Sequence, residues 1–100
     1  MKTLEIDASA CKTVKQFTPL LKQAIKAVEA IHGDSVHAFV DSMVFGVASD
    51  LPPPYEVVVT GLKHGQVQVF VDELSQAIGQ ARLEHRTRRN EDIRVSIRRG

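Results

Sequence analysis

The sequence contains little cysteine, few aromatic residues and no long apolar run. Its 100 residues include one cysteine, one tyrosine and no tryptophan. A lone cysteine, Cys11, excludes an internal disulfide and a cysteine-rich zinc site, so we expect a buried thiol in a reducing compartment. No segment approaches the roughly 18 apolar residues of a membrane span, and the N-terminus lacks the apolar region of a secretion signal. We therefore expect a soluble, cytoplasmic protein.

Positive charge is missing from the middle of the chain. No Lys or Arg occurs in residues 27–62, whereas all seven Arg lie from Arg82 onward. That last segment has a net charge of +4, and the rest of the chain has −3. The total of +1, with 43% hydrophobic residues, fits one globular domain over residues 1–100. The uneven distribution of charge bears on partners rather than on the fold.

The first half of the sequence predicts a strand and two helices. Residues 2–7 alternate between apolar and polar, as in a half-buried strand. Thr13 and Gln16 have the spacing of a capping box, which predicts a helix from there to about Ala30. Pro19 interrupts this pattern, so the helix either bends there or begins at Pro19 with Thr18 as its cap.

A second helix is predicted after Gly33, which ends the first helix, with Asp34 or Ser35 as its N-terminal cap. Its apolar residues recur at steps of three and four, which is the spacing of an amphipathic helix. These residues are Val36, Phe39, Val40, Met43 and Val44. The opposite face carries Asp34, His37, Ala38, Asp41 and Phe45.

The second half predicts a central strand, a long helix and a last strand. Residues 55–60 are apolar enough for a central strand. Apolar residues from Val67 to Ala81 predict a helix over about 67–86, a basic loop follows over 86–90, and residues 92–98 alternate as a strand. The order is β-α-α-β-α-β, and helical connections allow parallel strands. We predict an α/β fold with a small, three-stranded, mostly parallel sheet and helices packed on it.

The sequence offers little support for an enzyme. Ser35, His37 and Asp41 are the residue types of a nucleophilic triad, but on one helix Ser35 and His37 point about 200° apart. His37 and Asp41 would need a third ligand to hold a metal. The glycines at 61 and 65 lack the spacing of a phosphate-binding loop. We expect a non-enzymatic protein without cofactor or metal.

Two kinds of binding surface remain. The arginine-rich C-terminal segment, with Arg88 and Arg89 in its loop, could contact nucleic acid, although it has no aromatic residue for base stacking. The alternative explanation for these arginines is protection of a sheet edge against aggregation. The second surface is the helix face with Asp34, His37 and Asp41, where Phe45 adds an exposed aromatic side chain. This negative face would complement a basic cleft that binds RNA phosphates, or it is simply a solvated helix face.

Taken in order, several segments resemble the barstar family of intracellular ribonuclease inhibitors, over nearly the whole chain. The most specific segment runs from Gly33 to Asp41. The other segments are the strand over 2–7, the helix with Phe17, Leu21 and Ile25, Pro54 before an apolar strand, and the helix Leu74–Arg82 before residues 92–97.

This resemblance implies a specific function. In the family, the turn at Gly33 and the following helix plug the active site of a ribonuclease. The aspartate that Asp41 matches takes the place of a substrate phosphate among the arginines and histidine of the enzyme. Only Gly33 and Asp41 match this pattern directly. From helix geometry we add further expected partner contacts: Ile31, Asp34, Ser35, His37, Ala38, Val40 and Phe45.

The sequence also departs from the family. His37 stands where the family has a second acidic residue, and Val40 stands in place of a tryptophan. Ile31 and His32 replace a tyrosine, and Gln80 replaces the supporting acid of the last helix. We expect an immunity-type inhibitor of a basic, toxic ribonuclease. The alternative is a small nucleic-acid-binding or regulatory adaptor that uses the arginine-rich C-terminal strand.

Overall fold

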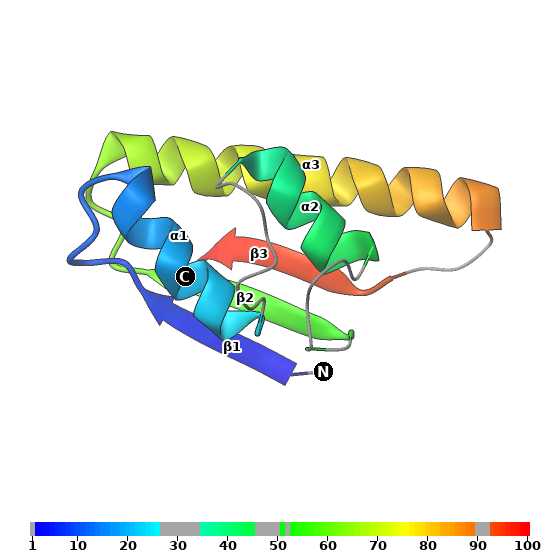
Figure 1. The fold of residues 1–100 in the computed structure, drawn as a ribbon, viewed down its shortest axis with the longest axis horizontal. Coiled ribbons are helices and arrows are strands. Elements are labelled where there is room, and N and C mark those ends of the chain that lie inside the picture. Colours follow the sequence, from blue (N-terminus) through cyan, green and yellow to red (C-terminus); the bar gives the residue numbers. More distant parts are fainter. Residues whose placement is uncertain (1, 27–34, 46–50, 52, 90–92) are drawn as a thin grey trace.

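The part of the chain that the structure describes forms three strands and three helices in the predicted order β-α-α-β-α-β (Figure 1). The computed structural model describes residues 2–26, 35–45, 51, 53–89 and 93–100. The elements are β1 (Lys2–Asp7), α1 (Val14–Ala24), α2 (Val36–Phe45), β2 (Tyr55–Thr60), α3 (Gly65–Arg89) and β3 (Val95–Arg99). The α/β prediction is therefore confirmed.

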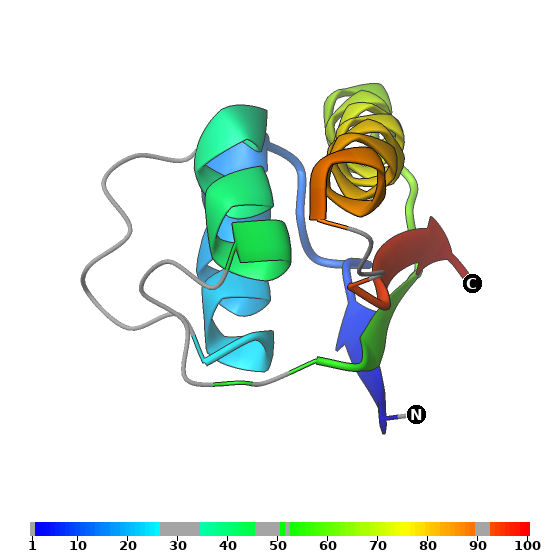
Figure 2. The same ribbon diagram turned by 90° about the vertical axis from the view of Figure 1, so that its right-hand side faces the viewer.

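The three strands form one parallel sheet in the order β1-β2-β3. As predicted, the apolar strand β2 is central. Because the strand order follows the sequence, connections of one hand place all helices on the same side of the sheet. Figure 2 shows this arrangement, with the three helices on one face and the opposite face uncovered.

The strand register explains how one sheet has an apolar and a polar face. Leu4, Val57 and Ile97 are aligned across the strands and point toward the helices. The next residues along, Glu5, Val58 and Arg98, are aligned on the outer face. That face is polar except for Val58, which the C-terminal residue Gly100 partly covers. A sheet with one solvated face alternates in this way because successive side chains point to opposite sides.

Helix α1 begins where the capping box predicts, but it ends early. Thr13 Oγ1 accepts a hydrogen bond from the Gln16 amide at 3.3 Å, and Pro19 lies inside the helix. The alternative start at Pro19 is therefore wrong. The predicted end near Ala30 is also wrong, because the helix stops at Ala24 and Lys26 has a left-handed φ of 53°. Ile25 follows the end of the helix and is fully buried. Its apolar side chain therefore indicates a buried position and does not indicate that the helix continues.

Helix α3 and strand β3 differ from the prediction at their shared boundary. The helix continues to Arg89, so residues 86–89 are helical and do not form the predicted basic loop. Arginine is a good helix former, and a solvated helix end needs no apolar periodicity. The last strand begins at Val95 rather than at residue 92 and extends to Arg99.

The core lies between the helices and the inner face of the sheet. Phe70 of α3 makes edge-to-face contacts with Phe17 of α1 and Phe39 of α2, each with ring centroids 6.0 Å apart.

Cys11 is 3% exposed, as predicted, and burial together with the Asp7 carboxylate raises the pKa of its thiol. Gly61 has a φ of +70° and approaches Asp7 and Ser9 so closely that a Cβ there would lie 2.9 Å from both side chains.

Candidate functional site

The candidate site begins at the N-terminus of α2, where a cap positions the helix. Ser35 Oγ accepts a hydrogen bond from the Ala38 amide at 3.1 Å. Such a bond satisfies one of the free amides in the first turn of a helix. Ser35 is therefore the cap that was predicted as one of two choices. The other predicted residues of this turn, Ile31, Gly33 and Asp34, lie outside the described residues.

Three polar or aromatic side chains follow one another along the outer face of α2. His37, Asp41 and Phe45 are spaced by four residues, so they share one side of the helix. The side chains of His37 and Asp41 are 87% and 42% exposed, and Phe45 is 53% exposed. His37 Nε2 lies 3.6 Å from Asp41 Oδ2, close enough for an ion pair when the imidazole is protonated. The exposed face predicted from the sequence is therefore present on α2.

Two of the expected contact residues point inward instead. Val40 is 7% exposed and belongs to the apolar core, and Ala38 is half-buried against the same core. Both are on the side of α2 that packs in the molecule, so they offer little surface to a partner. Val40 is nevertheless one of the residues that line the groove described next.

Helix α3 supplies the other wall of a groove beside this face. Helices α2 and α3 pack against each other, and the groove between them has a volume of about 440 Å³. On α3 its lining residues lie at i, i+3, i+4 and i+7, the spacing of one helix face. The lining residues are Val36, His37, Val40, Asp41 and Phe45 of α2 and Ala77, Gln80, Ala81 and Glu84 of α3.

Glu84 and His85 are site residues that the sequence analysis missed. Glu84 lies one turn after Gln80, the position matched to the supporting acid of the family. That spacing could have revealed it, because residues four apart share a face. The His85 ring meets Phe45 edge to face at 6.1 Å. With Glu84 and Arg88, the two rings line a smaller hollow of about 210 Å³ at the end of the groove.

The groove between α2 and α3 is negatively charged along its lining. Asp41 and Glu84 contribute carboxylates from opposite walls, and no Lys or Arg is among the lining residues that the structure describes. Arg88 stands only at the far hollow. A carboxylate held on a helix accepts strong, often bidentate, hydrogen bonds from a guanidinium group. The groove can therefore receive an arginine or lysine side chain, with Phe45 providing an apolar and aromatic contact beside it.

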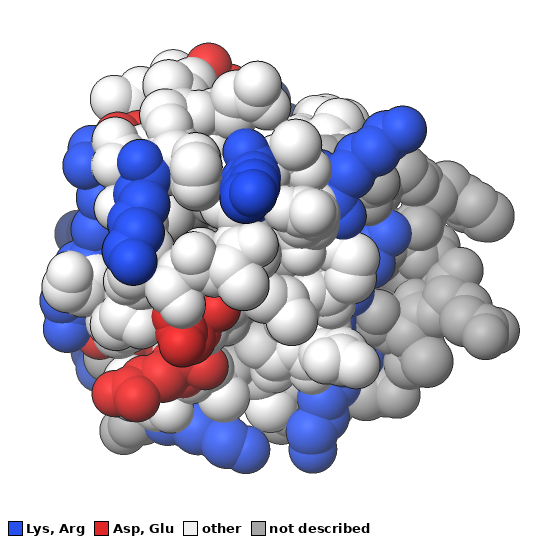
Figure 3. All heavy atoms as spheres, turned by 90° about the vertical axis from the view of Figure 1, so that its left-hand side faces the viewer, with Lys and Arg blue, Asp and Glu red and all other residues white. Residues whose placement is uncertain are grey.

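Two of the C-terminal arginines, Arg98 and Arg99, pair with carboxylates on different sides of the sheet. Arg98 Nε lies 3.2 Å from Glu56 Oε1 on the outer face of the sheet, and Arg99 pairs with Asp72 of α3. Hydrogen bonding to Asp72 raises the pKa of Arg99. Figure 3 shows the end of the molecule where the strands finish, and Lys, Arg, Asp and Glu side chains are interspersed on it.

Among the residues that the structure describes, no group of three His, Cys, Asp or Glu side chains is arranged to hold a metal ion. Within the same residues no helix is both long enough and apolar enough to cross a membrane.

No protein-family model matches the sequence, and no curated protein matches it. The resemblance to the barstar family stays a prediction from the order and spacing of residues.

Proposed function

We propose that this protein is an inhibitor that binds a small basic ribonuclease through the α2 face and blocks its active site. The observation that carries the proposal is the pair of carboxylates, Asp41 and Glu84, on facing walls of a groove whose described lining residues include no Lys or Arg. A ribonuclease cleft holds RNA phosphates with cationic side chains, so a rigid carboxylate can occupy a phosphate position there.

Each residue has a defined role in this proposal. Asp41 takes the place of the phosphate, and Glu84 adds a second negative charge across the groove. Phe45, at 53% exposed, provides the aromatic contact that protein interfaces favour. Ser35 acts through the backbone, because its cap fixes the start of the helix that presents Asp41. The resemblance to the barstar family also favours this face of the protein as the surface that binds a ribonuclease.

The test begins with immobilised chain and an extract of the native host. A captured small basic protein is assayed for RNA cleavage, and its inhibition by the purified chain is titrated. Asp41→Ala leaves the fold intact and increases the dissociation rate at least tenfold, because one partner of a charge-assisted contact is lost. Glu73→Ala is the matched control, since Glu73 is an exposed carboxylate of α3 that is not among the lining residues of the groove. An unchanged rate for Asp41→Ala, or an equal increase for Glu73→Ala, refutes the site.

The alternative, a nucleic-acid-binding adaptor on the C-terminal strand, has less support. Two of the arginines that it would use, Arg98 and Arg99, are already paired with carboxylates. If it holds, the isolated chain retains RNA with a steep salt dependence, because bound arginines release counterions from phosphates. Arg88→Gln would then abolish that retention.

A further inference from the structure

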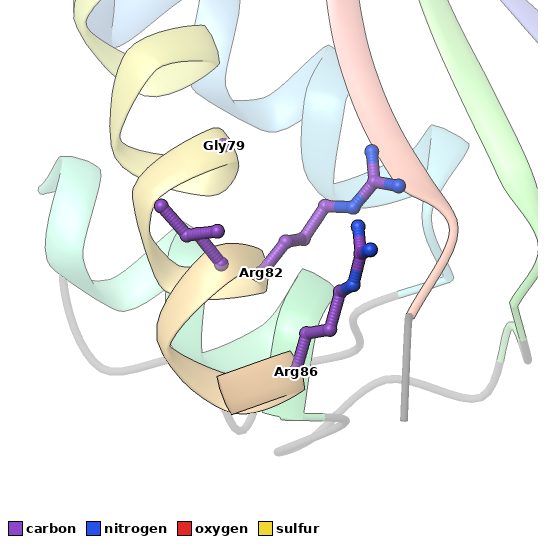
Figure 4. A pocket seen from close by; sticks show the side chains of 4 residues that line it. Gly79, Arg82 and Arg86 are labelled. Atoms are coloured by element: carbon purple, nitrogen blue, oxygen red, sulfur yellow. The ribbon is translucent and has the colours of Figure 1, made fainter. Parts of the chain in front are cut away.

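The two edges of the sheet differ in how their backbone groups are used. At the β3 edge, the Arg94 carbonyl accepts a hydrogen bond from the Tyr55 amide, so the backbone groups of the next residue, Val95, point away from β2. Arg82 Nη1 donates a hydrogen bond to the Val95 carbonyl at 3.1 Å. Figure 4 shows this side chain extending from α3 to β3. A side chain of α3 therefore already binds an outward-facing carbonyl of the β3 edge.

Strand β1 forms the other edge of the sheet, which Figure 1 shows at the bottom of the molecule. The Ala8 amide donates a hydrogen bond to the Thr60 carbonyl at 2.8 Å, so the even-numbered residues of this strand face β2. Backbone groups alternate in direction along a strand, so the amides and carbonyls of Thr3, Glu5 and Asp7 point out of the edge. These three residues are exposed, and among the described residues no backbone hydrogen bond outside the β1–β2 ladder reaches them. The β1 edge can therefore pair with a further strand.

A hollow of about 430 Å³ lies beside this edge, between β1 and α1. The second half of β1 forms one wall, and residues of α1 at i, i+3 and i+4, which share a helix face, form the other. The lining residues are Glu5, Ile6, Asp7, Leu20, Gln23 and Ala24. Leu20 is 36% exposed, so its apolar side chain is accessible. A strand added to the β1 edge would turn alternate side chains toward this hollow, where an apolar side chain would contact Leu20.

The outer side of the same edge is acidic. Glu5 and Asp7 share the face of the sheet that is turned away from the helices, and Glu5 forms no ion pair with any residue that the structure describes. Asp7 stays ionised, because hydrogen bonds from Ser9 lower the pKa of its carboxyl. Pairing β1 with a second copy of itself would bring the carboxylates of both copies together, and like charges on adjacent strands repel. The edge therefore favours a strand that carries Lys or Arg.

We propose that the β1 edge binds an extended segment of another protein in which basic and apolar residues alternate. The segment pairs its backbone with Thr3, Glu5 and Asp7, turns its apolar side chains into the hollow, and places its basic side chains beside the two carboxylates. In strand addition of this kind, main-chain hydrogen bonds supply affinity and alternate side chains supply specificity. The edge shares no lining residue with the groove between α2 and α3, so peptide binding here is independent of the proposed function.

The test is a titration of the isotope-labelled full chain with the peptide Lys-Val-Lys-Val-Lys, blocked at both ends, at constant ionic strength. Saturable NMR shifts are expected in the amides of β1. Hydrogen exchange at Thr3, Glu5 and Asp7 slows at least tenfold in the complex, whereas exchange at Ile6, which faces β2, changes less than twofold. Binding through charge alone would shift signals without slowing exchange at the three outward amides, and that result would overturn the proposal.

Two variants test the side-chain contacts. Glu5→Lys weakens the affinity for the basic peptide at least tenfold and strengthens the affinity for Glu-Val-Glu-Val-Glu, because it reverses a charge on the edge. Leu20→Gln weakens the affinity at least threefold, and its position on the exposed side of α1 leaves the fold intact. Glu73→Lys is the matched control, because it reverses the same charge at an exposed residue of α3 that does not line the hollow. Its affinity stays within twofold of the parent chain.

A second copy at this edge would be detected as slow exchange at the outward amides without peptide and as a sedimentation coefficient that rises with concentration. That result, equal affinities for the basic and acidic peptides, or equal losses for Glu5→Lys and Glu73→Lys would overturn the proposal. Glu5→Lys leaves inhibition of the captured ribonuclease unchanged, so failure at the β1 edge is distinguishable from failure of the proposed function.

Discussion

Tyr55 is the largest fully buried side chain among the described residues, and its hydroxyl has no hydrogen-bond partner there. Burial raises the pKa of this phenol far above its ordinary value, because the protein interior disfavours the phenolate. The fold therefore stabilises the protonated form. This contribution to stability is complete below about pH 10 and is lost as the pH rises above that value.

The chain is well suited to a direct test of this point, since Tyr55 is its only tyrosine and it has no tryptophan. We predict that absorbance at 295 nm, which reports phenolate, stays flat through pH 10 in the native protein and rises only together with the loss of circular dichroism. In denaturant the same signal titrates near pH 10. Ionisation near pH 10 with native circular dichroism would contradict the burial. Tyr55→Phe, the control without signal, loses no stability because the hydroxyl makes no bond to lose.

At the scale of elements, α1 depends on its N-terminal cap. Thr13 bonds the Gln16 amide, and Gln16 Oε1 accepts from the Lys12 amide at 2.7 Å. The helix also contains Pro19, which cannot donate to the Lys15 carbonyl. A helix that lacks one internal bond relies more on its end.

We predict that Thr13→Ala lowers the free energy of unfolding by about 1 kcal/mol, as measured by urea denaturation. Thr13→Ser retains the hydroxyl and stays close to the parent chain. Equal losses for the two variants would show that the threonine methyl group, rather than the cap, stabilises this end.

The limits of the elements were less predictable than their existence. Apolar spacing identified α2 correctly because its apolar residues, from the partly buried Val36 to the buried Val44, all face the core. It extended α1 too far because Ile25 is buried by tertiary packing beyond the helix end. It shortened α3 because the last turns are solvated, and solvated turns leave no periodic pattern.

At the scale of the whole molecule, stability is concentrated where layers meet. β2 pairs on both sides, and Val57 and Val59 are at most 1% exposed. α3 continues past the end of the sheet, where its side chains are mostly exposed (Figure 1). The free energy of local unfolding is higher for well-buried segments than for exposed ones, so it differs between these parts of the fold.

We predict that hydrogen exchange is slowest at the amides of residues 57–59 and much faster, by at least a hundredfold, in residues 84–88. Residues 71–78 of the same helix, which pack on the core, serve as the internal comparison and exchange slowly. Uniform protection along α3 would contradict this picture and would imply a further contact at its C-terminal end.

The sequence by itself determined the α/β class, the element order, the central strand and the exposed His37, Asp41 and Phe45 side of α2, because local spacing records which side chains face water. Only the tertiary structure decided which side chains meet across elements. It placed Glu84 opposite Asp41, paired Arg98 and Arg99 with acids distant in sequence, and joined Arg82 to β3. These contacts depend on how helices and strands pack against one another, and the spacing of residues within one segment does not specify that packing.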